Sequence, residues 1–446
     1  MAYDVFNYAE AGASAYETGV APAFLDLHSQ VDAWIASPPA SRLSVIYIGY
    51  NDIRSFGDFT GPIADYAAEI DRLIAAGATA GGKYVILALV HDFGSIPAGE
   101  TAWTTRTPIW NTAVAGLAAS RTNVVVVDVF TPIEDVLANP LDYGLFNVVG
   151  DAGSSRPGWL HSDGYHFGRQ GQELIAAVFD YCLRYRWDLT VSGSDPTTLN
   201  EEVIDYLKFR AWPAWRVIRD LADVDGWLAC FDPSNPETRT FRNSGGTDYV
   251  TTIEDGLGNW PDVVQGTAAN QPAFAPGHFG LLDGMGFNGS SHGMRGASSV
   301  TPISQPNIIL QLRELSTLDF PRFNISATGR TSNYEHHLYV ESFSWGGFPG
   351  LFAGGGLVGG TRTTNPVVAA GIFNGSSSKI FRNGTQLGST GNAGTRQLDG
   401  LSIGFNIVGA DSQHWPGWIG PTLVRNDADE TIMARMATAL QALGLA

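Results

Sequence analysis

The pattern of apolar and polar positions changes in character along the chain. From residue 1 to about residue 187, short β-branched runs alternate with segments whose apolar residues recur at helical spacing. The strand-like runs are LSVIYIGYND (43–52), KYVILALVHDFG (83–94) and NVVVVDVF (123–130). This alternation is typical of βαβ units, so we expect residues 1–187 to form a parallel sheet covered by helices.

A polar segment separates this part from the rest of the chain. Residues 188–200 are rich in Ser, Thr, Gly and Pro, as is common at a domain boundary. Residues 201–224 have apolar positions at helical intervals and are interrupted by Pro213, which predicts one or two short helices. We therefore expect a linker with connector helices over residues 188–225.

Residues 226–446 have a different pattern, with Gly, Asn, Ser and Thr between short strand-like pieces such as IILQLREL (308–315) and PVVAAGIF (366–373). FRNGTQ (381–386) predicts a hairpin, because Asn-Gly favours the turn whose twist matches antiparallel strands. Many short strands with such turns indicate an all-β sandwich. The segment DETIMARMATALQALG (429–444) predicts an amphipathic helix that begins with acidic residues.

Composition restricts the classes of partner. The formal net charge is −18 over 446 residues, which argues against nucleic acid, because phosphate binding depends on Lys and Arg. The chain has two cysteines, Cys182 and Cys230, and so lacks a disulfide framework or a CxxC-type metal cluster. We expect no metal or organic cofactor. The apolar runs are shorter than the roughly 20 residues of a membrane-spanning helix, and no signal peptide is visible at the start.

Two polar clusters in residues 1–187 have the residue types of a hydrolytic site. Gly12 and Asn51 would suit an oxyanion site, because a backbone N–H and a side-chain amide both donate to a developing negative oxygen. Asp163 and His166, in LHSDGYHFGRQGQ, would suit a general base and its orienting carboxylate. Taken singly, each cluster also fits an ordinary turn or a solvated loop.

Order and spacing make the pattern more specific. NYAEAGAS (with Gly12), IGYND (with Asn51) and SDGYH (with Asp163 and His166) resemble the second, third and last sequence blocks of the SGNH, or GDSL, esterase and lipase family. The resemblance covers residues 1–187 and implies a flavodoxin-like α/β fold. It also implies that Gly12 and Asn51 are oxyanion donors, that His166 is the base and that Asp163 orients it.

The family's first block, Gly-Asp-Ser, which supplies the serine nucleophile, does not occur in the chain. VGDAGSS (149–155) has Ala152 in the serine position, and Ser14 stands where a helix cap or turn residue is common. In the family's sheet, the serine strand lies between the strands that DVFNYA (4–9) and SVIYIGY (44–50) would form. An empty position there would expose apolar side chains worth on the order of 10 kcal/mol, comparable with the stability of a whole domain.

Three hypotheses account for the missing strand and serine. A second polypeptide inserts both, the chain is a shortened or mis-started copy, or the sheet closes differently around a lost active site. We favour the first, which predicts a partner chain that completes the N-terminal sheet and an oligomeric assembly.

The second half of the chain also resembles a known family. GWLACFDPSNPETRTF (226–241), GNWPDVVQGTAANQPAF (258–274) and GLLDGMGFNGSSHGM (280–294) resemble the opening of concanavalin A-like, laminin-G-like jelly-roll domains. Such domains bind glycans in many members and are structural in others. Aromatic and histidine side chains that could be exposed and contact a glycan are Tyr334, His336, His337, Trp345 and Trp415. In a sandwich, such aromatic residues more often belong to the core.

Together the two resemblances imply a protein directed at a cell-surface polysaccharide, with a carbohydrate esterase-like domain and a glycan-binding domain. The expected location is extracellular or on the surface of a virion-like particle. The alternative is a non-catalytic adhesin, such as a receptor-binding spike or fibre of a phage, which needs no nucleophile. Serine reactivity discriminates between the two, so whether the chain is an enzyme stays open at this point.

Overall fold

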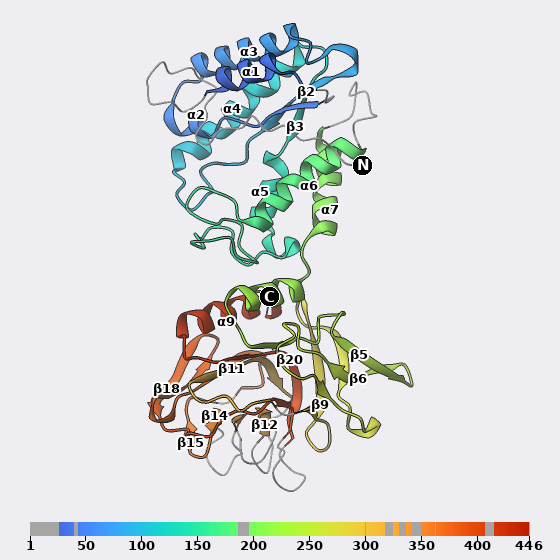
Figure 1. Ribbon diagram of the computed structural model, residues 1–446, viewed down its shortest axis with the longest axis vertical. Coiled ribbons are helices and arrows are strands. Elements are labelled where there is room, and N and C mark those ends of the chain that lie inside the picture. Colours follow the sequence, from blue (N-terminus) through green and yellow to red (C-terminus); the bar gives the residue numbers. More distant parts are fainter. Residues whose placement is uncertain are drawn as a thin grey trace. The chain divides into compact units, whose positions relative to one another are not determined.

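The computed structural model falls into two compact units, unit 1 (Met1–Ala211) and unit 2 (Trp212–Ala446), shown in Figure 1. It describes residues 26–39, 43–185, 196–298, 300–316, 324–329, 336–340, 349–361, 363–405 and 414–445. The boundary between the units falls inside the segment 188–225 for which the sequence predicts a linker.

Unit 1 contains a parallel sheet with the strand order β1 (Leu43–Ile46), β2 (Tyr84–Leu89) and β3 (Val124–Asp128). In register, Val45 lies opposite Ile86, and Ile86 opposite Val125. The three apolar runs of the sequence supply these strands, so the predicted parallel sheet is confirmed. Each strand ends before its run does, and the apolar residues Ile48, Val90 and Val129 that follow the three strands are buried.

Helices cover both faces of this sheet (Figure 1). Val85 and Leu87 of β2 pack with α1 (Leu27–Ala36), α3 (Thr60–Ala75) and α4 (Thr101–Ala119). Ile86 and Ala88 point the other way and pack with α5 (Phe130–Ala138), α6 (Arg169–Tyr185) and α7 (Pro196–Arg210). This is the alternation expected of a strand buried on both faces. The shorter elements are α2 (Tyr50–Ser55), η1 (Ala80–Gly82) and η2 (Pro140–Tyr143). The result is a three-layer α/β unit, and its flavodoxin-like connectivity stays a prediction.

The two predicted connector helices belong to different units. Pro213 caps α8 (Ala214–Val224), and the break between α7 and α8 falls at residues 211–213 as predicted. Helix α7 packs on α5 and α6 of unit 1, whereas α8 packs on β4 and α9 of unit 2. Both helices are therefore part of a folded unit.

Unit 2 is built from antiparallel strands in two layers. One layer runs β18-β17-β16-β11-β20-β9-β8 and the other β15-β14-β13-β12-β19-β10-β7, and β6 pairs with both β7 and β8. The strands are β4 (Ala229–Phe231), β5 (Arg239–Ser244), β6 (Thr247–Ile253), β7 (Val263–Val264), β8 (Ala273–Phe279), β9 (Leu282–Asn288), β10 (Met294–Gly296), β11 (Asn307–Leu315), β12 (Asn324–Thr328), β13 (His337–Val340), β14 (Pro349–Phe352), β15 (Gly356–Val358), β16 (Val367–Phe373), β17 (Ser378–Arg382), β18 (Thr385–Gly391), β19 (Ser402–Ile403) and β20 (Pro416–Arg425). The predicted all-β sandwich is confirmed.

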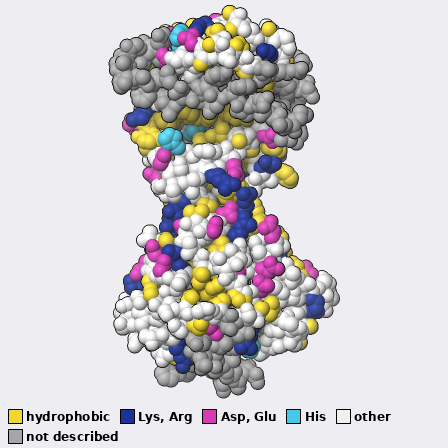
Figure 2. Space-filling view, in the orientation of Figure 1, with side chains coloured by type: hydrophobic (Ala, Val, Ile, Leu, Met, Phe, Trp, Pro, Cys, Tyr) yellow, Lys and Arg dark blue, Asp and Glu magenta, His cyan; other side chains and the backbone are white. Residues whose placement is uncertain are grey.

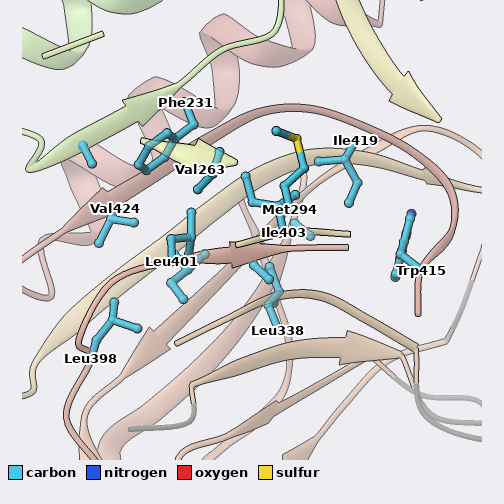
Figure 3. Close-up of a cluster of buried hydrophobic side chains, with 14 of the residues drawn as sticks. Phe231, Val263, Met294, Leu338, Leu398, Leu401, Ile403, Trp415, Ile419 and Val424 are labelled. Carbon is cyan, nitrogen blue, oxygen red and sulfur yellow. The ribbon is translucent and has the colours of Figure 1, made fainter. Parts of the chain in front are cut away.

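The core of unit 2 lies between the two layers. Ile419 of one layer and Leu338, Met294 and Ile403 of the other belong to a single buried cluster, with Trp415 at one side of it (Figure 3). The outer face of β11 and β16 is covered by the C-terminal helix α9 (Glu430–Gly444). Asp429 caps that helix by accepting the backbone N–H groups of Thr431 and Ile432.

Figure 2 shows acidic and basic side chains interspersed on the visible face of the described residues. None of the helices in the described ranges is long and apolar enough to cross a membrane.

Candidate functional site

The residues Asp163 and His166 lie together in an exposed loop of unit 1. His166 Nδ1 is 2.9 Å from Asp163 Oδ2, and the two side chains are 75% and 49% exposed. The loop is shaped by Asp163 itself, because its Oδ1 accepts the backbone N–H groups of Tyr165 (2.7 Å) and His166 (2.8 Å). The carboxylate thus fixes both the loop and the orientation of the imidazole ring.

Asp163 stays ionised at neutral pH. The backbone N–H of Tyr165 and, next, the His166 side chain lower the pKa of its carboxyl to about 2. An ionised partner on Nδ1 leaves the other ring nitrogen, Nε2, to accept a proton. Within the described part of the chain, the His166 side chain forms hydrogen bonds with Asp163 alone.

Close packing explains why the IGYND segment after β1 has a glycine at position 49. Gly49 has φ 131°, and a Cβ there would lie 2.3 Å from Nε1 of the buried Trp110. No other residue fits this position, because both the backbone conformation and the contact exclude a side chain. Gly49 precedes α2, so its packing on Trp110 sets the position of Asn51 in the first turn of that helix.

The chain after β2 is held by polar side chains of α4. Asn111 accepts the N–H of Val90 (3.0 Å) and donates to its carbonyl (2.8 Å), and Thr107 accepts the N–H of Phe93 (3.3 Å). These hydrogen bonds are buried, so they define the backbone on both sides of His91.

His91 connects this segment to α2 and to the Asp163–His166 loop. Its Nδ1 is 2.6 Å from the Tyr50 hydroxyl, and its ring lies 4.4 Å from that of Phe167, which stacks on His161 at 5.2 Å. Burial lowers the pKa of His91 to about 3 and that of His161 to about 4, so both rings are neutral at pH 7. The rings act as packing groups that tie three segments together.

Two further contacts place the loop beside α2 and beside the segment that follows β2. The guanidinium of Arg54 lies 5.3 Å from the centre of the Tyr165 ring, and the N–H of Ala98 donates to the carbonyl of Gly164 (2.9 Å). The helix that carries Asn51 and the loop that carries His166 therefore meet at the carboxyl ends of β1 and β2. In an α/β sheet this is the edge where ligands bind.

The structure describes only some of the predicted site residues. Gly12, Tyr334 and Trp345 lie outside the described residues. His336 and Trp415 are buried, with Trp415 1% exposed and its Nε1 donating to the Glu314 carbonyl (3.0 Å). The expectation that these two side chains could be exposed is therefore corrected, because a buried ring offers no face to a sugar. His337 is partly exposed, and its ring lies 5.2 Å from that of Phe352.

Sequence reasoning missed Tyr50, His91 and Phe167. The positions of Tyr50 and His91 in the sequence could have indicated them. Each lies at the end of an apolar strand run, and the two runs end at the same edge of a parallel sheet. Phe167 carried no such signal. The described residues contain no group of three His, Cys, Asp or Glu side chains placed to hold a metal ion.

No protein-family model matches the sequence, and no curated protein matches it either. Among solved structures, the chain is similar to domain 4 of AbnA, an extracellular arabinanase from Geobacillus stearothermophilus in complex with arabinotriose, with 14% identity and a TM-score of 0.36 over 47% of this chain and 98% of that one. It is also similar to Trypanosoma rangeli sialidase in complex with sialic acid (14% identity, TM-score 0.33, 54% and 40% of the two chains). A third similar structure is an arabinofuranosidase complexed with arabinofuranosyl-alpha-1,2-xylobiose, with 14% identity and a TM-score of 0.35 over 51% of this chain and 65% of that one. The chain spans less than two thirds of the last two proteins. Similarity at these TM-scores does not establish a shared fold.

Proposed function

We propose that unit 1 supplies the acid–base half of a serine esterase site that acts on an acylated cell-surface polysaccharide, and that unit 2 binds the glycan. The observation that carries this proposal is the Asp163–His166 pair, in which Nδ1 is bound to an ionised carboxylate and the ring is 75% exposed. This is the arrangement a general base needs, because the carboxylate fixes the orientation of the ring.

The proposed reaction passes through an acyl-enzyme. His166 Nε2 takes the proton of a serine hydroxyl while the serine oxygen attacks the ester carbonyl, and the protonated ring then gives that proton to the departing sugar oxygen. Water, activated by the same nitrogen, releases the acid. The Asn51 side chain and the backbone N–H of Gly12 donate to the oxyanion.

The serine comes from a second polypeptide, which also completes the sheet beside β1. Exposure of β1 supports this assignment: Val45 in that strand is 49% exposed, whereas the central residues of the neighbouring β2 are buried. A strand added beside β1 would cover the apolar side chain and bring a residue to the carboxyl end of the sheet. This arrangement predicts an oligomeric assembly that acts outside the cell or on a particle surface.

The test is to treat the native assembly, with the chains that co-purify, with a fluorophosphonate that labels activated serines and to identify the modified peptide by mass spectrometry. We expect labelling on a companion chain, and its loss in assemblies that carry His166→Ala. Asp151→Asn is the matched control, because Asp151 is an exposed aspartate of unit 1 that also accepts a backbone N–H, that of Gly153 (2.6 Å). It should leave labelling unchanged.

Absence of labelling on every chain would sink the catalytic proposal. Glycan binding that survives His166→Ala would then support the non-catalytic adhesin, in which unit 1 serves as a scaffold.

A further inference from the structure

Unit 2 has a small cavity between the two layers of the sandwich, with accessible room for about one water molecule. Its lining includes the side chain of Arg313 on β11 and the ring of Trp415. The segment between β15 and β16 adds Thr361 and Thr363, and Arg382 of β17 contributes a second cation. A cavity of this size holds a water molecule or a single small ion, and it excludes sugars and other polyatomic ligands.

Arg313 brings a positive charge to this cavity. It is 3% exposed, and burial lowers the pKa of its guanidinium to about 9, so the group stays charged at pH 7. Of its several N–H donors, one on Nη1 binds the hydroxyl of Ser326. The guanidinium also lies 4.9 Å from the centre of the Trp415 ring. Neither of these partners carries a negative charge.

The buried polar side chains beside Arg313 are neutral as well. Gln311, two residues earlier on β11, donates to the Thr422 hydroxyl (2.9 Å), and the Ser326 hydroxyl donates to the Leu338 carbonyl (3.1 Å). Among the described residues, no carboxylate forms an ion pair with Arg313. Hydrogen bonds to neutral groups do not neutralise a cation, and a buried charge without a counter-ion is strongly unfavourable.

The rest of the described lining suits an anion. It includes two arginines and no acidic residue, although the whole chain has 44 acidic against 26 basic residues. The Thr363 hydroxyl oxygen accepts the N–H of Asn365 (3.0 Å), which leaves the hydroxyl proton available to an acceptor. Thr361 and Asn365 are exposed, so the cavity borders on the protein surface at this segment.

A water molecule fits the cavity but leaves the charge of Arg313 uncompensated, whereas a carboxylate or a phosphate compensates the charge but does not fit. We propose that this cavity binds a chloride ion, held by charge-assisted hydrogen bonds from Arg313 and by the hydroxyl of Thr363. The ion is a structural anion of unit 2, and it makes the stability of this unit depend on the chloride concentration. The site is separate from the proposed glycan binding and does not depend on it.

The test is thermal unfolding of the full chain at constant ionic strength, with chloride replacing gluconate stepwise from about 1 mM to about 100 mM. Gluconate is the matched anion that is too large for the cavity. For a chloride dissociation constant of about 10 mM, the unfolding midpoint of unit 2 should rise by about 3 to 5 °C over this range. No rise in the parent protein overturns the proposal.

Two arginine variants locate the effect. In Arg313→Met the midpoint should not respond to chloride, and in gluconate alone it should equal or exceed that of the parent protein, because an uncompensated buried charge is removed. Arg242→Met is the matched control, since Arg242 is a partly exposed arginine of the same unit whose guanidinium lies 4.8 Å from the centre of the Tyr249 ring. This variant should keep the rise. A rise of equal size in Arg313→Met shows that chloride acts elsewhere and overturns the assignment.

If Arg313→Met does not fold, crystals of the parent protein grown with bromide in place of chloride decide. Anomalous scattering identifies a bromide ion and distinguishes it from a water molecule. An anomalous peak within hydrogen-bond distance of the Arg313 guanidinium supports the proposal, and density there without an anomalous signal shows a water molecule and overturns it.

Discussion

Asp232 is a buried carboxyl group of unit 2 whose protonation is coupled to folding. It is 3% exposed, and its Oδ1 accepts the N–H of Ser234 (2.8 Å). Burial, with a smaller contribution from the charge of Asp283, raises the pKa of this carboxyl to about 6. The folded state therefore holds its proton more tightly than the unfolded state, in which an Asp pKa is about 3.9.

The sign of the pH dependence follows from that difference. Because the folded pKa is the higher one, the stabilisation is fully present below about pH 4 and is lost as the pH rises through about 6. Two pKa units correspond to about 3 kcal/mol. Asp232→Asn, which is uncharged throughout, should remove this loss and raise the free energy of unfolding at pH 7 by up to about 3 kcal/mol.

Urea unfolding of unit 2 at pH 4, 5, 6 and 7 measures this effect. Glu254→Gln, at an exposed carboxylate of the same unit, is the control and should leave the pH profile unchanged. A profile of Asp232→Asn that parallels that of the parent protein would contradict the assignment.

At the scale of elements, the β17–β18 hairpin isolates the contribution of one turn residue. Asn383 and Gly384 have φ values of 52° and 76°, as the turn that matches antiparallel strands requires. A Cβ at Gly384 would meet no atom within 4 Å, so the cost of a side chain there is a backbone cost alone. We expect Gly384→Ala to lower the free energy of unfolding by about 1 to 2 kcal/mol.

The matched control is Gly266→Ala in the same unit. Gly266 also has open space around it, but its φ lies outside the left-handed region. The same substitution there should be neutral or stabilise by about 0.4 to 1 kcal/mol, because it restricts the unfolded chain. Urea midpoints of the two variants test the difference, and equal midpoints would show that the turn does not set the stability.

The sequence predicted a strand, helix end or turn correctly where a few adjacent residues determine it. The strand runs before Gly49 and His91, the break at Pro213 and the Asn383–Gly384 turn each follow from residues that are adjacent in sequence. The burial of β11 on both faces was not predictable, because it depends on α9, which begins more than a hundred residues later. Arg313 reads from the sequence as an ordinary charged position on a strand, because its burial depends on contacts with Ser326 of the other layer and with Trp415.

In the candidate site, too, some residues could be predicted from a local motif and others could not. Asp163 and His166 are three residues apart, so a local motif could name them, and their hydrogen bond lies within one loop. The group formed by Tyr50, His91 and Phe167 joins three distant segments. Only the packing of the helices on the sheet brings these residues together, and no spacing in the sequence reports it.

At the scale of the whole molecule, each unit buries its core among its own residues. The clusters of unit 1 lie within residues 27–211 and the described cluster of unit 2 within residues 228–424. The sequence places the start of the second domain at residue 226, whereas the compact unit begins at Trp212 and includes α8. Val217, Ile218 and Leu221 of α8 are fully buried, in a helix that packs on α9 and β4.

Two fragments test whether the second domain begins at residue 212 or at residue 226. The fragment 212–446 should fold by itself and unfold in one transition that matches a transition of the full chain. The fragment 226–446 lacks α8 and loses the burial of three apolar side chains, at about 1.5 to 3 kcal/mol each, so its free energy of unfolding should be lower by roughly 5 to 9 kcal/mol. Urea unfolding followed by tryptophan fluorescence measures both. Equal stability of the two fragments would show that α8 is a connector and not part of the folded unit, and failure of fragment 212–446 to fold would show that unit 2 depends on residues before Trp212.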